Sequence, residues 1–318
     1  EVRLDIALPK TWIPDTITQI TEIASTTGTL KNYVDRENNY GYITANLGPK
    51  ESLQINITFY SLKFKVDFYT HNLVQNLSYP NEYIKYTQPE QYIESNDLLI
   101  ANKAEALAGD RKNPIRIAEK MYDFVRSYLT YEAQSEIRGA SWALLNGRGD
   151  CTEYGTLFVA LLRAVGIPSR IVMGHVSTEL SRGGVANATG LWINSPHLWT
   201  ELYVDGFGWI PVDPTFGVDD PLNHFGVGWA HYLPIIKGPT MESPYRALFT
   251  YKPVSMKCDA YLIVKPLENI SLFNQTIADF FTANNLTNEM RLIAYTAYQN
   301  GFNITQAHPI ITQTYSLL

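Results

Sequence analysis

The chain has 318 residues, of which 45% are hydrophobic, and it carries a formal net charge of −6 with a sequence pI near 5.6. This charge argues against a nucleic-acid or anionic-membrane partner, because binding phosphates requires clustered Lys and Arg. No apolar run reaches the roughly 18–20 residues needed to cross a bilayer. At this length we expect one main domain with one or two appendages.

The N-terminal part, residues 1–90, is predicted to be a β-rich domain. Apolar and polar residues alternate over 53–60 and again over 62–69, on either side of Ser61. This pattern is typical of a hairpin or a pair of sandwich strands. The polar, Pro-containing stretch 79–94 predicts a linker, which limited proteolysis would cut first.

Helical periodicity begins near Asp97 and resumes at Pro114, which suits the first turn of a second helix. A central helix is predicted after Asp150, where apolar residues recur at helical spacing: Tyr154, Leu157, Phe158, Leu161, Leu162 and Val165. We expect this helix to be buried on most sides. Gly166 is a natural C-terminal cap, and Pro168 prevents continuation.

Strands are expected next at 170–174, 199–204 and 209–212, with a turn at 205–208 between the last two. A strand-like segment over 254–264 and a helix over 288–298 follow. We therefore divide the chain into three parts: an N-terminal β-rich domain (1–90), a catalytic core (91–250) and a small C-terminal α/β extension (251–318).

Several features predict an extracellular or cell-surface glycoprotein. Seven Asn-X-Ser/Thr sequons occur, at Asn56, Asn76, Asn187, Asn269, Asn274, Asn285 and Asn303. The chain begins at Glu1 without Met, so we expect a trimmed ectodomain or a processed product.

Only two cysteines are present, Cys151 and Cys258, and we expect both thiols to be free, since a disulfide would consume the better nucleophile.

Three residues stand out as candidates for catalysis: Cys151, His197 and Asp213. A thiol, an imidazole and a carboxylate are the parts of a nucleophile, a general base and a group that orients the base. In the first turn of a helix, Cys151 would lie near unpaired backbone N–H groups and the positive end of the helix dipole, which favour a thiolate and an oxyanion. The alternative is an ordinary buried cysteine.

The strand that His197 begins and the strand that Asp213 ends are expected to form an antiparallel pair. His197, Trp199 and Glu201 share one face of their strand. Asp213 shares that face only if the hairpin loop has an odd number of residues, and a three-residue loop would place it opposite Trp199 or Glu201.

Neighbouring polar and aromatic residues have structural interpretations. Arg170 is expected to pair with an internal carboxylate such as Glu201, and Glu153 to cap the central helix. Four tryptophans are expected to pack rather than to line a groove: Trp142, Trp192, Trp199 and Trp209. A zinc site is an alternative use of the histidines, formed by His197, Asp213, His224 and His231, but their spacing matches no metal motif.

Three blocks resemble the transglutaminase-like superfamily of papain-like cysteine enzymes, over about residues 97–217. They are Gly147–Gly155 with the helix to Arg170, then His197-x-Trp-x-Glu-x-Tyr203, then Trp209-x-Pro-x-Asp-Pro-Thr215. The resemblance implies an α+β fold in which a helix bearing Cys packs on an antiparallel sheet bearing His and Asp. It also implies Cys151 as nucleophile, His197 as base and Asp213 as orienter, in a cell-surface or secreted member of prokaryotic or archaeal type.

The reaction is expected to be thiol-dependent amide chemistry on a protein or peptide substrate, through a thioester on Cys151. We expect a cysteine peptidase or amidohydrolase, because water is the default acceptor of an acyl-enzyme. Protein-glutamine transglutamination is one alternative, and a non-catalytic surface binding module on the same fold is another. No cofactor or metal is expected, and a longer parent protein could be attached to a membrane.

Overall fold

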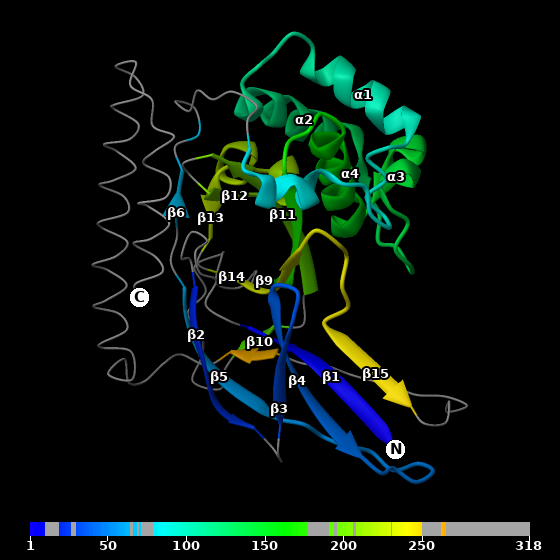
Figure 1. Ribbon diagram of the computed structural model, residues 1–318, viewed down its shortest axis with the longest axis vertical. Helices are drawn as coiled ribbons and strands as arrows, with labels where there is room; N and C mark the ends of the chain where they lie inside the picture. The colour runs from blue at the N-terminus through cyan, green and yellow to red at the C-terminus, as the bar shows by residue number, and fades with distance from the viewer. Residues whose placement is uncertain are drawn as a thin grey trace.

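A computed structural model describes residues 1–9, 19–26, 30–63, 66–68, 70, 79–176, 191–193, 196–205, 208–229, 231–249 and 262–264. The labelled α-helices gather at the top of Figure 1, a sheet of N-terminal strands lies at the bottom, and a second sheet runs between them. Both four-stranded sheets are antiparallel. The chain therefore has the α+β architecture that the sequence predicts.

The lower sheet joins the beginning of the chain to a segment far along it. Its order is β15-β1-β4-β3, with bounds Tyr245–Phe249, Val2–Leu8, Asn38–Ala45 and Lys31–Asp35. Strand β15 belongs to the expected core by sequence position, yet it hydrogen-bonds to β1. The three-part division stays a prediction, and this sheet crosses the boundary placed at residue 90.

The hairpin expected from 53–60 and 62–69 is wrong. A single strand, β5 (Ile57–Lys63), runs through Ser61 and pairs with β2 (Gln19–Thr26). The short β6 (Val66–Asp67) pairs instead with β13 (Val227–Gly228). Alternation of apolar and polar residues fixes which residues share a face, but it does not identify the partner strand.

The linker expected at 79–94 is also wrong, because this stretch packs against the core. It contains the 3-10 helix η2 (Asn81–Thr87). Tyr86 is only 3% exposed and its ring meets Trp209 edge-on, with 4.7 Å between the ring centroids. Tyr83 stacks on Tyr203 at 3.6 Å between centroids. Limited proteolysis should therefore spare these residues.

The described part of the chain contains four α-helices, and α1, α2 and α4 begin after an Asp or Asn cap, whereas α3 begins after Gly139. Their bounds are Leu98–Ala108 for α1, Pro114–Tyr128 for α2, Ala140–Asn146 for α3 and Cys151–Ala164 for α4. The Asp97 side chain accepts a hydrogen bond from Leu99 N, and Asn113 caps α2 ahead of Pro114. Asx side chains at these positions satisfy backbone donors that a helix start leaves unpaired.

Helix α4 lies at the centre of the main core, against the upper sheet. That sheet has the order β12-β11-β9-β14, with bounds Gly208–Val212, Pro196–Val204, Ser169–Val176 and Tyr232–Gly238. Gly155 allows the close approach, because a Cβ there would lie 2.1 Å from Leu198 Cδ2. As expected, α4 is buried on most sides and ends before Gly166, whose φ is +77°.

Short elements complete the described part of the chain. A parallel pair joins β7 (Thr130–Tyr131) to β8 (Arg148–Gly149). Strand β10 (Leu191–Ile193) pairs with β16 (Leu262–Val264), and two 3-10 turns, η3 (Phe216–Val218) and η4 (Pro221–Asn223), follow β12. Cys258 and the helix predicted at 288–298 lie outside the described residues, as do all the sequons except Asn56, which is exposed.

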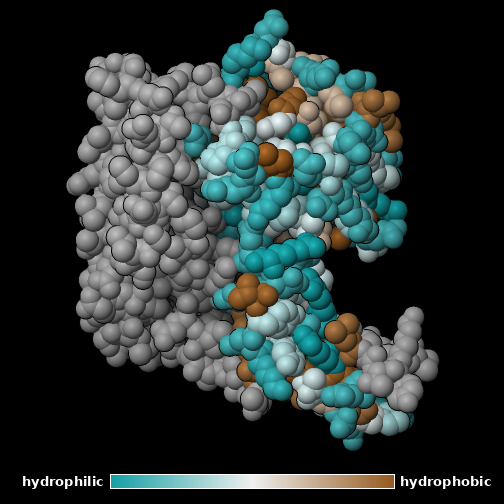
Figure 2. Space-filling model, viewed as in Figure 1, coloured by the Kyte–Doolittle hydropathy of each residue, from teal (hydrophilic) through white to brown (hydrophobic). Residues whose placement is uncertain are grey.

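The surface offers little contiguous apolar area on the face shown. Figure 2 shows hydrophilic residues over most of the described part of this face, with hydrophobic residues in small separate groups. Single exposed apolar side chains are normal in soluble proteins. In the described part of the chain, no helix combines the length and the apolar character that a membrane crossing demands.

Candidate active site

The local sequence around α4 fixes Cys151 at the first position of that helix. The Asp150 side chain accepts a hydrogen bond from Thr152 N at 2.9 Å, and Glu153 Oε2 accepts one from Asp150 N at 3.1 Å. The Asp150 side chain also accepts from Glu153 N, which completes the capping box, so the interpretation of Glu153 as a cap is confirmed. Cys151 is half-buried and is not in a disulfide.

Glu153 reaches the cap from a fully buried position. Its Oε1 also accepts a hydrogen bond from Arg138 N at 2.9 Å, which ties the segment before α3 to the start of α4. Burial raises the pKa of Glu153, and the two backbone N–H groups oppose that rise. A Cβ on Gly149 would lie 2.2 Å from Glu153 Cβ, so only glycine fits there.

The hairpin of β11 and β12 has the odd loop that the site requires. Val204 pairs with Gly208, which leaves three residues between the paired positions. Thr200 pairs with Val212, so the next step of the register brings Asp213 opposite Trp199. Side chains directly opposite share a face of the sheet, and this face also carries His197. The expected register is confirmed.

His197 and Asp213 meet in a buried hydrogen-bonded pair. His197 Nε2 lies 2.8 Å from Asp213 Oδ2, which is hydrogen-bond distance. Nδ1 is the other ring nitrogen, and Cys151 is, after Asp213, among the groups that raise the pKa of His197. The three predicted residues are therefore brought together from α4, β11 and the end of β12.

Four donors surround the Asp213 carboxylate. Oδ1 accepts from Thr215 N at 3.0 Å and Phe216 N at 3.1 Å, in the turn that follows β12. Oδ2 accepts from His197 and also from the Tyr232 hydroxyl at 2.7 Å. Hydrogen bonds to a carboxylate favour its charged form, and they compensate for its removal from water.

The electrostatics of the pair favour an imidazolium beside a carboxylate. Burial alone lowers the pKa of His197, but the charge and hydrogen bond of Asp213, together with Cys151, raise it to about 10. Burial likewise raises the pKa of Asp213, yet His197 and the Tyr232 hydroxyl outweigh it, so the pKa falls below 3.8. The positive ring and the negative carboxylate stabilise each other.

Aromatic rings fix the plane of the imidazole. The His197 ring centroid lies 4.7 Å from that of Phe216 and 6.1 Å from that of Trp199, and Tyr232 meets it at right angles. Sequence reasoning missed Phe216 and Tyr232. Phe216 directly follows the third block, so its proximity was a usable signal. Tyr232 lies on β14, outside all three blocks, and its sequence context carries no signal.

A buried charged group lies farther along the same face of the sheet. Glu201 accepts from Arg170 Nε at 2.7 Å and from Lys237 Nζ at 2.8 Å. Arg170 is 2% exposed and lies 4.0 Å from the Trp209 ring centroid. The expected pairing of Arg170 with Glu201 is confirmed. Trp209 packs against other rings as expected, but Trp209 and Trp199 also line a pocket, which the packing interpretation did not foresee.

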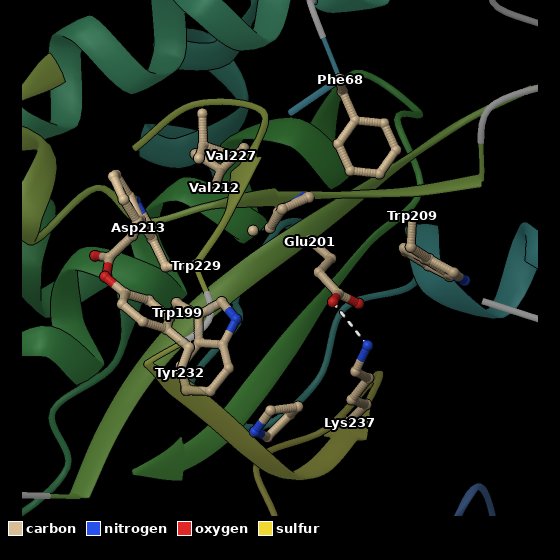
Figure 3. A pocket seen from close by; sticks show the side chains of 13 residues that line it. Phe68, Trp199, Glu201, Trp209, Val212, Asp213, Val227, Trp229, Tyr232 and Lys237 are labelled. Carbon is tan, nitrogen blue, oxygen red and sulfur yellow. Dashed lines mark hydrogen bonds and ion pairs between the residues drawn. The ribbon is translucent and has the colours of Figure 1, made fainter. Parts of the chain in front are cut away.

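A pocket opens between these two groups. Figure 3 shows Asp213, Trp199, Trp229 and Tyr232 at one end and the Glu201–Lys237 ion pair at the other. The pocket is lined by residues of the upper sheet and of the segments beside it: Phe68, Trp199, Glu201, Trp209, Pro211, Val212, Asp213, Val227, Gly228, Trp229, Tyr232, Pro234 and Lys237.

The histidines do not form the zinc site considered as an alternative. His224 and His231 follow β12 in the chain, and His224 Nδ1 lies 3.5 Å from the Tyr232 hydroxyl. Within the described ranges, however, no group of three or more His, Cys, Asp or Glu side chains is arranged to hold a metal ion. Asp213 instead accepts a hydrogen bond from His197.

Part of the chain matches a known protein family. The family model described as "Transglutaminase-like superfamily" matches residues 101–214. The chain carries a transglutaminase-like domain. The matched range contains Cys151, His197 and Asp213. The fold of the chain resembles the crystal structure of a candidate cysteine protease from Cytophaga hutchinsonii, with a TM-score of 0.53, 16% identity, and coverage of 84% of this chain and 91% of that one.

Relatives of known sequence each match part of the chain. YebA of Bacillus subtilis is 28% identical over 150 residues, which are 43% of this chain and 20% of YebA. An uncharacterized protein of Haemophilus influenzae is 28% identical over 161 residues, 44% of this chain and 42% of that protein. A protein-glutamine gamma-glutamyltransferase of Pseudomonas aeruginosa is 37% identical over 70 residues, 22% of this chain and 10% of that enzyme. The chain thus spans less than half the length of each.

Proposed function

We propose that the transglutaminase-like domain is a cysteine peptidase or amidohydrolase that cleaves protein or peptide amides through a thioester on Cys151. The observation that carries the proposal is the buried His197–Asp213 pair, 2.8 Å between Nε2 and Oδ2, with Cys151 beside the imidazole at the start of α4. A nucleophile, a base and a group that orients the base are the parts required for acyl transfer.

Acylation begins from the Cys151 thiolate and the His197 imidazolium. The sulfur bonds to the amide carbonyl carbon, and the C–N bond breaks as the imidazolium gives its proton to the leaving nitrogen. The products are a thioester and a free amine, or ammonia from a side-chain amide. The imidazole is then neutral, and Asp213 holds its ring in place.

The start of α4 supplies a donor for the oxyanion. The capping box engages the N–H groups of Thr152 and Glu153. The N–H of Cys151 is not among the groups that the cap engages. We assign it to the oxygen that becomes negative as the sulfur attacks, because a helix N-terminus favours negative charge there.

Deacylation by water restores the resting state. His197 takes a proton from water, the hydroxyl oxygen bonds to the acyl carbon, and the C–S bond breaks to release an acid and the thiolate. The proton on His197 regenerates the imidazolium. An amine in place of water would give a cross-link, and this transglutaminase reaction is the second candidate. The 70-residue match to the Pseudomonas glutamyltransferase favours it.

The cellular location of the enzyme is part of the same proposal. We propose an extracellular or cell-surface enzyme, on the basis of the seven sequons and of the exposed side chain of Asn56. Its partners would be protein or peptide substrates. The third candidate function is a binding module, which would not need a buried imidazole placed beside a half-buried thiol.

A peptide library separates the three functions. The protein is incubated with the library, and mass spectrometry reads cleavage, deamidation by about one mass unit or cross-links. Cleavage or deamidation is expected. Cys258→Ala, which changes the second thiol, is the matched control and should behave as wild type. Cross-links alone would favour the transglutaminase, and no product would favour the binding module.

A further inference from the structure

Tyr232 connects the catalytic pair to a strand that contributes no proposed catalytic residue. It begins β14, which pairs with β9, whereas Asp213 follows β12 at the opposite edge of the same sheet. The ring is buried and lies across the face of the sheet against Trp199, with 5.1 Å between the ring centroids. Its hydroxyl donates to Asp213 Oδ2 at 2.7 Å.

The Tyr232 hydroxyl donates to Asp213 Oδ2, the same oxygen that accepts a hydrogen bond from His197. Backbone N–H groups hold Oδ1 within the turn after β12, but that turn belongs to the same segment as Asp213 itself. Besides His197 on β11, Tyr232 on β14 also reaches Oδ2 from another strand. Two donors on Oδ2 define the rotation of the carboxylate about its Cβ–Cγ bond, so that Oδ2 points at His197 Nε2.

The surroundings of Tyr232 keep its hydroxyl protonated, so that it donates a hydrogen bond to Asp213. Burial and the neighbouring Asp213 charge raise the pKa of Tyr232 well above its ordinary value, so the phenol stays neutral and keeps its proton. His224 Nδ1 lies 3.5 Å from the hydroxyl, and burial lowers the pKa of His224. The backbone carbonyl of His224 accepts from Asp213 N at 2.8 Å, which fixes the main chain at the same point.

We propose that Tyr232 is a positioning residue: its hydroxyl holds the Asp213 carboxylate in line with His197, and through that bond it keeps the imidazolium beside Cys151. The inference rests on the proposed function, because it assigns Tyr232 to the same pair. Without the hydroxyl, the carboxylate can turn, the bond to Nε2 weakens, and the imidazolium loses stabilisation. A purely structural role would lower stability without changing the titration of His197.

The substitution Tyr232→Phe tests this, because it keeps the ring against Trp199 and removes only the hydroxyl. The readout is the pKa of the His197 imidazole, measured by NMR titration of the full chain, and it needs no substrate. In wild type, His197 should titrate near pH 10. In Tyr232→Phe the midpoint should fall by about one unit, the size expected for a weakened hydrogen bond to a charged group.

A matched control is Tyr122→Phe. Tyr122 is also buried near Asp213, but its hydroxyl donates to the backbone carbonyl of Pro221 at 3.0 Å. This variant loses a buried tyrosyl hydroxyl without changing the carboxylate, and its His197 midpoint should match wild type. The rate of Cys151 alkylation by iodoacetamide at pH 6, read on the Cys151 peptide, should fall several-fold in Tyr232→Phe and stay unchanged in Tyr122→Phe.

The outcomes separate this inference from the proposed function. An unchanged midpoint in Tyr232→Phe would overturn the inference, and a raised one would show that Tyr232 competes with His197 for the carboxylate instead of orienting it. A raised wild-type midpoint without catalysis would contradict only the proposed function. If Tyr232→Phe does not fold, the wild-type hydroxyl proton should give a downfield NMR signal that Asp213→Asn removes. The absence of that signal would overturn the inference.

Discussion

Asp150 and Glu153 cap the start of α4 reciprocally, so that Cys151, the first residue of the helix, is held between two hydrogen-bonded neighbours. The cap requires the Glu153 carboxylate to be buried, and burial raises the pKa of that group. What it provides is a fixed position for the thiol relative to His197. The cap is therefore the first place where the account can be tested by mutation.

We predict that Glu153→Ala lowers the free energy of unfolding by about 2–3 kcal/mol, because it leaves two backbone N–H groups without an acceptor. They belong to Arg138 and Asp150. Glu153→Gln keeps an oxygen acceptor and should cost about 1 kcal/mol. Urea denaturation measures both. Equal losses in the two variants would show that the hydrogen bonds are not what makes Glu153 important.

We predict that Gly149→Ala slows alkylation of Cys151 and lowers the free energy of unfolding by about 1–3 kcal/mol, because the new Cβ would collide with Glu153. Gly166→Ala is the control. It introduces a Cβ into open space at a φ of +77°, at a cost of about 1 kcal/mol, and should not affect Cys151. If both variants alkylate at the wild-type rate, then the fit of Gly149 does not position the thiol.

The His197–Asp213 pair should give stability a specific pH dependence. The pKa of His197 is raised from 6.5 to about 10, so its contribution is complete below pH 6.5 and is lost as pH rises toward 10. The pKa of Asp213 is lowered from 3.8, so its contribution is present above pH 3.8 and is lost as pH falls through the lower folded value.

The stability lost in Asp213→Asn should therefore be largest between about pH 4 and 6.5 and should shrink toward pH 10. Chemical denaturation of wild type and variant across this range measures the difference. A difference that does not change with pH would mean that the two groups are not coupled in the folded protein.

The Glu201 cluster predicts a large effect from one substitution. Glu201→Leu leaves the buried cations of Arg170 and Lys237 without this carboxylate and should cost about 3–5 kcal/mol. Asp123→Ala breaks the surface pair with Arg126 and should cost less than about 1 kcal/mol. Thermal unfolding of the two variants makes the comparison, and similar losses would contradict the buried pairing.

The parts of the site that the sequence predicted depend on local geometry. A helix cap, the periodicity of a helix and the length of a hairpin loop depend on residues that are close together in the sequence. The positions of Asp150 and Cys151 and the register that carries Asp213 could therefore be inferred in advance. The order of these segments in one chain then indicated that the thiol, imidazole and carboxylate would meet.

The parts that the sequence did not predict depend on contacts between distant segments. The burial of Tyr86 comes from rings more than 100 residues away, Tyr203 and Trp209, and a stretch with polar neighbours resembled a linker. The pairing of β1 with β15 spans almost the whole described chain. Tyr232 reaches Asp213 from a strand at the far edge of the sheet, and strand order is not encoded in the spacing of the three blocks.

The central claim is that Cys151 forms a thioester with the substrate. The most direct measurement is mass spectrometry of the intact and digested protein after rapid acid quenching during turnover of a peptide amide. We predict an acyl adduct on the Cys151 peptide in wild type and in Cys258→Ala, and neither adduct nor product in Cys151→Ala, whose activity should fall by about 10⁴-fold or more. Turnover by Cys151→Ala near the wild-type rate, or an adduct found only on Cys258, would contradict the account.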